Sequence, residues 1–118
     1  MIAGEPSPER KYPRHAVHVP LYVSLEGSLY HKPVALESKD VSGGGLAFVT
    51  RSRLPIDAAS RVIVSRLGDL PSSAQILARV AYRREDPETG GYTVGLEFTE
   101  FVDVTRDELL ARIEGWRG

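Results

Sequence analysis

Two clusters of residues in this chain have the types and spacing to bind an anion or a purine base. The first is an Arg-x-x-x-Arg segment formed by Arg10 and Arg14. Arginine carries a planar set of N–H donors that fits phosphate oxygens and the acceptor edge of guanine. Both arginines lie in a proline-containing stretch, where they could close over a ligand. The spacing alone is a weak signal, because Arg79 and Arg83 repeat it inside a predicted strand and a solvated basic segment also explains it.

The second cluster is Asp40, Ser42 and Gly45, which form an Asp-x-Ser-x-x-Gly pattern at the end of a predicted strand. A carboxylate can accept the paired N–H groups of a guanine Watson–Crick edge, and a serine hydroxyl can bond a base oxygen or a phosphate. Glycine lets backbone N–H groups approach an anion closely. The alternative is a tight turn whose backbone is bonded by the Asp and Ser side chains themselves.

The sequence gives little support for a metal site or a catalytic site. The three histidines, His15, His18 and His31, have no second ligand at metal-binding spacing, and the chain has no cysteine. The acidic residues near Asp86 and Asp103 are better explained as loop and capping charges than as catalytic pairs. No serine lies in a nucleophile elbow, and no phosphate-binding loop with its lysine is present. We therefore predict no enzyme activity, no catalytic residues, no metal and no cofactor.

The composition narrows the class of partner. The chain has 118 residues and a net charge of −1, from 15 basic and 16 acidic residues. This balance argues against a general DNA or RNA binder, which needs a dense basic face. No apolar run approaches the roughly 20 residues of a membrane span, and no signal peptide is recognised. With no cysteine, the sequence suits a reducing compartment, and we expect a cytoplasmic protein without a membrane partner.

Alternating apolar and polar residues predict the strands that must position the two clusters. The first alternation covers 16–25, where Pro20 indicates an edge strand or a bulge, because proline cannot donate to a ladder. Further strands are expected at about 31–39, 46–50, 61–67, 75–83 and 92–99. Five or six short strands favour a small antiparallel barrel, since closure removes the exposed edges. The sequence therefore predicts a mainly all-β fold.

A helix is expected at the C-terminus. Apolar residues there recur at helical spacing, at Leu109, Ile113 and Trp116. Thr105 followed by Glu108 fits a capping box, although Asp103 is an alternative cap. We predict that this helix packs as a lid on the barrel; a partner-binding helix is the alternative. The expected organisation is a mobile leader over 1–9 and one domain over 10–118, with the barrel at about 16–100 and the helix at about 104–117.

Taken together and in this order, the two clusters resemble the PilZ domain family. The resemblance extends from about Arg10 to the C-terminal helix. It implies a six-stranded antiparallel PilZ-type β-barrel with a C-terminal α-helix that binds cyclic di-GMP. In the family, the arginines hold a guanine edge and the phosphates, while the Asp/Ser/Gly turn holds the other guanine side. The residues that carry this over are Arg10, Arg14, Asp40, Ser42 and Gly45.

The resemblance also bears on residues near the motifs. It extends the candidate site to Lys11 and Gly44, which lie within the motifs. Tyr82 lies where family members often have a large residue near the ligand, so its ring could stack on a base. Its alternation with Val80 favours a place in the core instead. Glu9 precedes the first motif arginine and would repel the phosphates of a second ligand, which favours one ligand per chain.

The function that follows is a cyclic di-GMP receptor or adaptor. Ligand binding would order the arginine segment against the barrel and signal to a downstream effector protein whose identity the sequence does not specify. A ligand-independent protein–protein adaptor of the PilZ type is the main alternative. A small-barrel nucleic-acid binder is a third hypothesis, disfavoured by the missing basic stripe.

Overall fold

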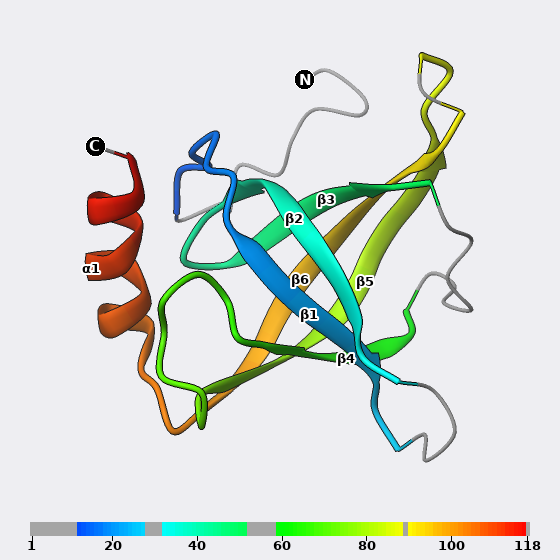
Figure 1. The fold of residues 1–118 in the computed structure, drawn as a ribbon. Coiled ribbons are helices and arrows are strands. Elements are labelled where there is room, and N and C mark those ends of the chain that lie inside the picture. The colour runs from blue at the N-terminus through cyan, green and yellow to red at the C-terminus, as the bar shows by residue number, and fades with distance from the viewer. Residues whose placement is uncertain (1–11, 28–31, 52–58, 89, 118) are drawn as a thin grey trace, which may run out of the picture.

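The computed structural model describes residues 12–27, 32–51, 59–88 and 90–117. These residues form six strands and one helix (Figure 1). The predicted leader and the motif residues Arg10 and Lys11 lie outside the described residues. The elements are β1 (Pro20–Leu25), β2 (Val34–Val41), β3 (Gly45–Thr50), β4 (Arg61–Ser65), β5 (Gln75–Glu85), β6 (Tyr92–Val102) and α1 (Arg106–Arg117).

The six strands close into a barrel in the order β1-β2-β3-β6-β5-β4. Every neighbouring pair is antiparallel, including the β1–β4 pair that closes the barrel. Each strand is therefore paired on both sides and presents no open edge to another chain. The predicted fold, a six-stranded antiparallel barrel with a C-terminal helix, is confirmed. The one helix formed by the described residues, α1, is too short and too polar to cross a membrane.

The first strand begins later than its alternation predicts. Pro20 is its first residue, and it lies neither on an edge nor at a bulge. A proline is tolerated at this position because the missing N–H falls outside the ladder. The chain just before it is held by the side chain of Ser38, whose Oγ donates to the Val17 carbonyl and accepts from the Val19 amide at 3.0 Å. The apolar residue Val17 is buried there without belonging to a strand.

The core lies inside the barrel and continues under the helix. The inward face of each strand supplies most of its apolar residues, as the period of two predicts, whereas β3 is buried on both faces. Members that are almost completely buried include Leu21, Phe48, Val62, Ile76, Val80 and Leu96. Three irregularities interrupt the registers: one between Ser38 and Asp40 in the β2–β3 pair, and two in the β5–β6 pair, between Leu77 and Ala78 and between Val80 and Tyr82. Such bulges rotate the following side chains to the other face of the strand.

Helix α1 covers the barrel as a lid (Figure 1). Its start is a capping box: the Glu108 amide donates to Thr105 Oγ1 at 3.1 Å, and the Thr105 amide donates to Glu108 Oε1 at 2.9 Å. Asp103, the alternative cap, instead adopts a left-handed φ of 58°. Leu109 and Ile113 are completely buried in the core. The packing interpretation of the helix is thereby confirmed.

The C-terminal end of α1 is fastened to the loop between β4 and β5. The Trp116 ring packs directly on Gly68, and its Nε1 donates to Asp69 Oδ1 at 2.9 Å. Arg112 pairs with the same carboxylate at 3.0 Å. The hydrogen bond from Trp116, followed by that from Arg112, lowers the pKa of the Asp69 carboxyl below its ordinary value. The helix is thus held by apolar burial along its length and by polar contacts near its end.

Candidate ligand-binding site

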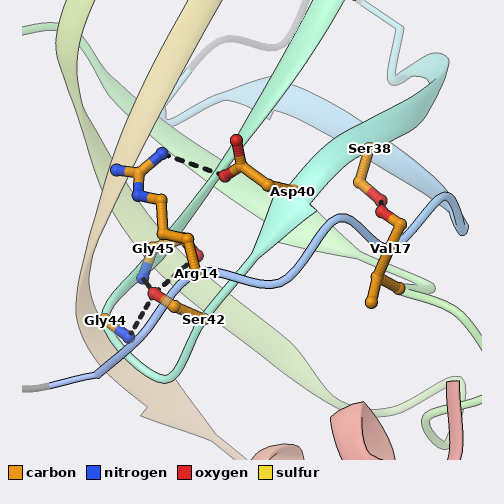
Figure 2. Close-up of polar contacts among 7 residues, drawn as sticks. All are labelled: Arg14, Val17, Ser38, Asp40, Ser42, Gly44 and Gly45. Atoms are coloured by element: carbon orange, nitrogen blue, oxygen red, sulfur yellow. Dashed lines mark hydrogen bonds and ion pairs between the residues drawn. The ribbon is translucent and has the colours of Figure 1, made fainter. Parts of the chain in front are cut away.

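The two sequence motifs meet at an ion pair on the outside of the barrel. Arg14 Nη1 lies 2.9 Å from Asp40 Oδ1 (Figure 2). Arg14 precedes β1, and Asp40 lies near the end of β2. The backbones are held together by a bridge between His15 and Val41, whose amides each donate to the other's carbonyl at 3.0 Å. The motif segment therefore runs along the end of β2, which brings Arg14 beside Asp40.

This ion pair is only partly sheltered from solvent. The side chains of Arg14 and Asp40 are 24% and 22% exposed. Within the described residues, Arg14 Nε is buried and has no hydrogen-bond partner. A buried donor without a partner carries an energetic cost in the folded state. The pair thus combines an accessible carboxylate with a guanidinium that retains an unused donor.

Ser42 shapes the turn between β2 and β3. Its Oγ accepts from the amides of Gly44 and Gly45, at 3.1 and 3.2 Å (Figure 2). The Ser42 amide in turn donates to the Gly45 carbonyl at 2.8 Å. Ser42 is only 4% exposed, so its hydroxyl is committed to the turn backbone. The tight-turn interpretation of this residue is therefore correct for the described structure.

Gly45 is required where β3 passes close to β6. A Cβ at this position would collide with the backbone carbonyl oxygen of Leu96. Because the obstacle is backbone within a paired strand, it cannot move aside without disturbing the ladder. Gly44 is less constrained: its nearest neighbour would be the Tyr12 ring at 3.4 Å. The Gly44 carbonyl accepts from the Phe98 amide at 2.9 Å, which ties the turn to β6.

A row of residues crosses the outer face of four strands beside the ion pair. Asp40 on β2 pairs with Ala47 on β3, which pairs with Gly95 on β6, which pairs with Tyr82 on β5. The next row, formed by Leu46, Leu96 and Val80, is buried in the core. Because side chains alternate between faces along a strand, the first row points away from the core. Ala47 and Gly95 leave no long side chain in the middle of this row.

Tyr82 belongs to this outer row, and its assignment to the core is wrong. The bulge between Val80 and Tyr82 breaks the alternation and rotates Tyr82 out of the barrel. Its half-buried ring lies over Gly95, and the Arg84 guanidinium carbon lies 4.8 Å above the ring centre. The sequence contains one signal of this packing, Gly95, because a glycine inside a strand often marks a place where another group approaches the backbone closely. The position of Arg84 has no comparable signal.

The second Arg-x-x-x-Arg pair has a different environment. Arg79 forms an exposed ion pair with Glu97 on the adjacent strand. Arg83 lies with its guanidinium carbon 4.7 Å from the centre of the Tyr92 ring. Both arginines thus contact neighbours on β6, and Glu97, the partner of Arg79, is the strand partner of the motif residue Gly45. Equal spacing in the sequence therefore leads to unlike sites in the fold.

The outer row offers the chemistry of a base-binding surface. Asp40 supplies an acceptor and Arg14 supplies donors at one end. Tyr82 and Arg84 supply an aromatic ring and a stacked cation at the other. Between them, Ala47 is 1% exposed and the Tyr82 ring covers Gly95, so the flat surface open to a planar base is the Tyr82 ring and not the middle of the row. No three His, Cys, Asp or Glu side chains gather as a metal site in the part of the chain that the structure describes.

The comparisons with known proteins agree with this architecture. The family model for the PilZ domain matches residues 8–115. Among solved structures, the chain is similar to the Bacillus subtilis inhibitor of motility MotI/DgrA, with a TM-score of 0.66 and 21% sequence identity. That match covers 93% of this chain but 55% of the other, so the chain spans little more than half of that protein. No match is found among curated proteins. On this evidence the chain belongs to the PilZ domain family, a family of cyclic di-GMP-binding adaptor domains rather than enzymes.

Proposed function

We propose that this chain is a cytoplasmic receptor domain for cyclic di-GMP that signals to a partner protein. The ligand itself is the only small molecule required, with no cofactor or metal. The site is assigned to the residues of the two motifs, Arg10, Arg14, Asp40, Ser42 and Gly45. Lys11, Gly44 and Tyr82 are assigned to the periphery of the same site.

The observation that carries this proposal is the ion pair between Arg14 and Asp40. These residues are 26 positions apart in sequence, yet their side chains are 2.9 Å apart. If the Arg-x-x-x-Arg spacing were accidental, or if the Asp-x-Ser-x-x-Gly residues only formed a turn, nothing would require Arg14 and Asp40 to form an ion pair. Arg79 and Arg83 illustrate the difference, because the same spacing there leads to an ion pair with Glu97 and a ring contact with Tyr92, both on β6.

The geometry suggests separate roles for the motif residues. Asp40 accepts the N–H groups of a guanine edge, and Arg14 donates to a phosphate or to the guanine acceptors. Ser42 and Gly45 act mainly through the shape of the turn, because their polar groups are bonded to each other. Tyr82, with Arg84 above its ring, offers stacking contact farther along the outer row.

Signalling requires that the ligand bind one arrangement of the arginine segment more tightly than the others. A ligand with equal affinity for all arrangements would shift none of them. We infer that cyclic di-GMP favours the arrangement in which the segment lies along the barrel. The effector protein would then recognise the surface made by segment, ligand and barrel together.

A calorimetric titration with cyclic di-GMP tests the proposal, with cyclic di-AMP as the nucleotide control. Arg14→Ala and Asp40→Ala should each weaken binding at least about 30-fold, the effect of losing one partner of a desolvated charged hydrogen bond. Arg79→Ala is the matched control, because it removes an arginine of identical spacing, and its affinity should equal that of the unaltered protein. The expected stoichiometry is one ligand per chain, in accord with Glu9.

Three outcomes would contradict this function. Unchanged affinity in both motif variants would disprove the assigned site. Absence of any heat from the unaltered protein would favour the ligand-independent adaptor. Binding of oligonucleotides with a steep salt dependence would favour a nucleic-acid binder instead.

A further inference from the structure

Arg106, the first residue of α1, lies against the candidate site without belonging to either motif. Its Nε donates to the carbonyl oxygen of Gly43 at 2.9 Å. Its guanidinium carbon lies 5.2 Å from the centre of the Tyr12 ring and 4.9 Å from that of Phe101. Gly43 is an intervening residue of the Asp-x-Ser-x-x-Gly turn, and Tyr12 is an intervening residue of the Arg-x-x-x-Arg segment. One side chain therefore contacts both motifs.

Tyr12 and Gly43 also contact each other directly. A Cβ on Gly43 would lie 2.9 Å from the Tyr12 ring and 2.9 Å from the Leu110 side chain. The turn is therefore enclosed by the tyrosine on one side and the helix on the other. Arg106 completes this arrangement, because its guanidinium lies within cation–π distance of both aromatic rings while its Nε donates to the Gly43 carbonyl. Segment, turn and helix form one packed unit beside Arg14.

The position of Arg106 in the helix runs against local electrostatics. A cation in the first turn faces the positive end of the helix dipole, whereas Asp107 and Glu108 suit that end. Residues that break a local rule are often kept by a contact elsewhere. Here the half-buried guanidinium has two such contacts, the Gly43 carbonyl and the aromatic pair. The side chain is directed at the ligand-binding turn and contributes nothing to helix capping.

We propose that Arg106 is a positioning residue of the cyclic di-GMP site. It holds Tyr12 against the Gly43 turn and so places Arg14 beside Asp40 before the ligand arrives. Such preorganisation raises affinity because less ordering remains to be done on binding. The inference rests on the proposed function, since it concerns affinity for the same ligand. It assigns to α1 a part in ligand binding in addition to its role as a lid.

The test compares two arginines of the same helix by titration with cyclic di-GMP. Arg106→Ala should weaken binding about tenfold, within the usual range of coupling between linked sites. Arg112→Ala is the matched control, because it removes the contact of α1 with Asp69 in the β4–β5 loop, to which neither motif contributes. Its affinity should stay within about twofold of the unaltered protein. Equal weakening in both variants would overturn the proposal in favour of a general loosening of the helix.

A second variant separates geometry from charge. Arg106→Lys keeps the positive charge but loses the planar guanidinium and its Nε donor. We expect it to bind as weakly as Arg106→Ala, while the fluorescence of Trp116 shows the helix still docked in both. Full recovery of affinity by lysine, or normal affinity in Arg106→Ala, would overturn the role of Arg106 alone. Absence of binding by the unaltered protein would overturn the proposed function and this inference together.

Discussion

Single residues of the Asp-x-Ser-x-x-Gly motif have unlike tasks in the fold. Asp40 presents a carboxylate to the outer face and to Arg14. Ser42 and Gly45 are buried, and their polar groups are bonded within the turn. A ligand can therefore exchange contacts with Asp40 directly, whereas it depends on the other two for the shape of the backbone. Substitutions in one motif should separate into effects on binding and effects on folding.

Gly45→Ala should lower the stability of the fold as well as ligand affinity. The new methyl group would collide with the Leu96 carbonyl and push β3 away from β6. Overpacking of this kind costs about 1–3 kcal/mol of the free energy of unfolding. Chemical denaturation monitored by circular dichroism measures the change. Gly44→Ala is the control, because its Cβ would meet only an ordinary contact with Tyr12; equal losses in the two variants would contradict the close-approach explanation.

At the scale of elements, the contact of α1 with the β4–β5 loop depends on an ionised carboxylate. Asp69 accepts from Trp116 and pairs with Arg112, and both contacts lower the pKa of its carboxyl. A group whose pKa is lower in the folded state stabilises that state above its unfolded pKa. This contribution is lost as the pH falls through the folded value. The end of the helix should therefore loosen in acid.

Thermal unfolding of Asp69→Asn across a pH series tests this dependence. The unaltered protein should be the more stable at neutral pH, and the difference should shrink as the pH falls below about 4 and then vanish. The chain has a single tryptophan, Trp116, so its fluorescence reports on the contact directly. Glu114→Gln, which removes an exposed pair with Arg117 on the same helix, should change stability little. A difference that stays constant down to strongly acidic pH would contradict this role of Asp69.

The elements also show how far the sequence alone could go. The period of two located β1, β5 and β6, turn residues delimited the other three strands, and the capping box located the start of α1, because these signals are local. The sequence did not predict the later start of β1, because a hydrogen bond from the Ser38 side chain holds the preceding residues out of the strand. It did not predict the outward orientation of Tyr82, because a bulge interrupts the alternation there. Arg106 was not identified because its partners are distant in sequence and meet it only in the folded chain.

At the scale of the whole molecule, the closed barrel limits where a ligand can act. The interior is filled with apolar side chains, and every strand is paired on both sides. A ligand can therefore attach only to the outside, where the segment, the turn and the outer row lie together. Binding there adds contacts between the barrel and the segment before β1. The folded state should gain stability from the ligand by mass action.

Thermal unfolding with and without cyclic di-GMP measures this gain. A ligand at about 100 times its dissociation constant stabilises the folded state by about 2.7 kcal/mol, which corresponds to a rise of roughly 10 °C in Tm for a chain of this size. Asp40→Ala should lose most of the rise at the same ligand concentration, because its carboxylate lies at the site. Arg79→Ala should keep the full rise, since Arg79 belongs to neither motif and its ion pair with Glu97 is exposed to solvent. An equal rise with cyclic di-AMP, or in Asp40→Ala, would show that stabilisation comes from contacts other than those of the outer face.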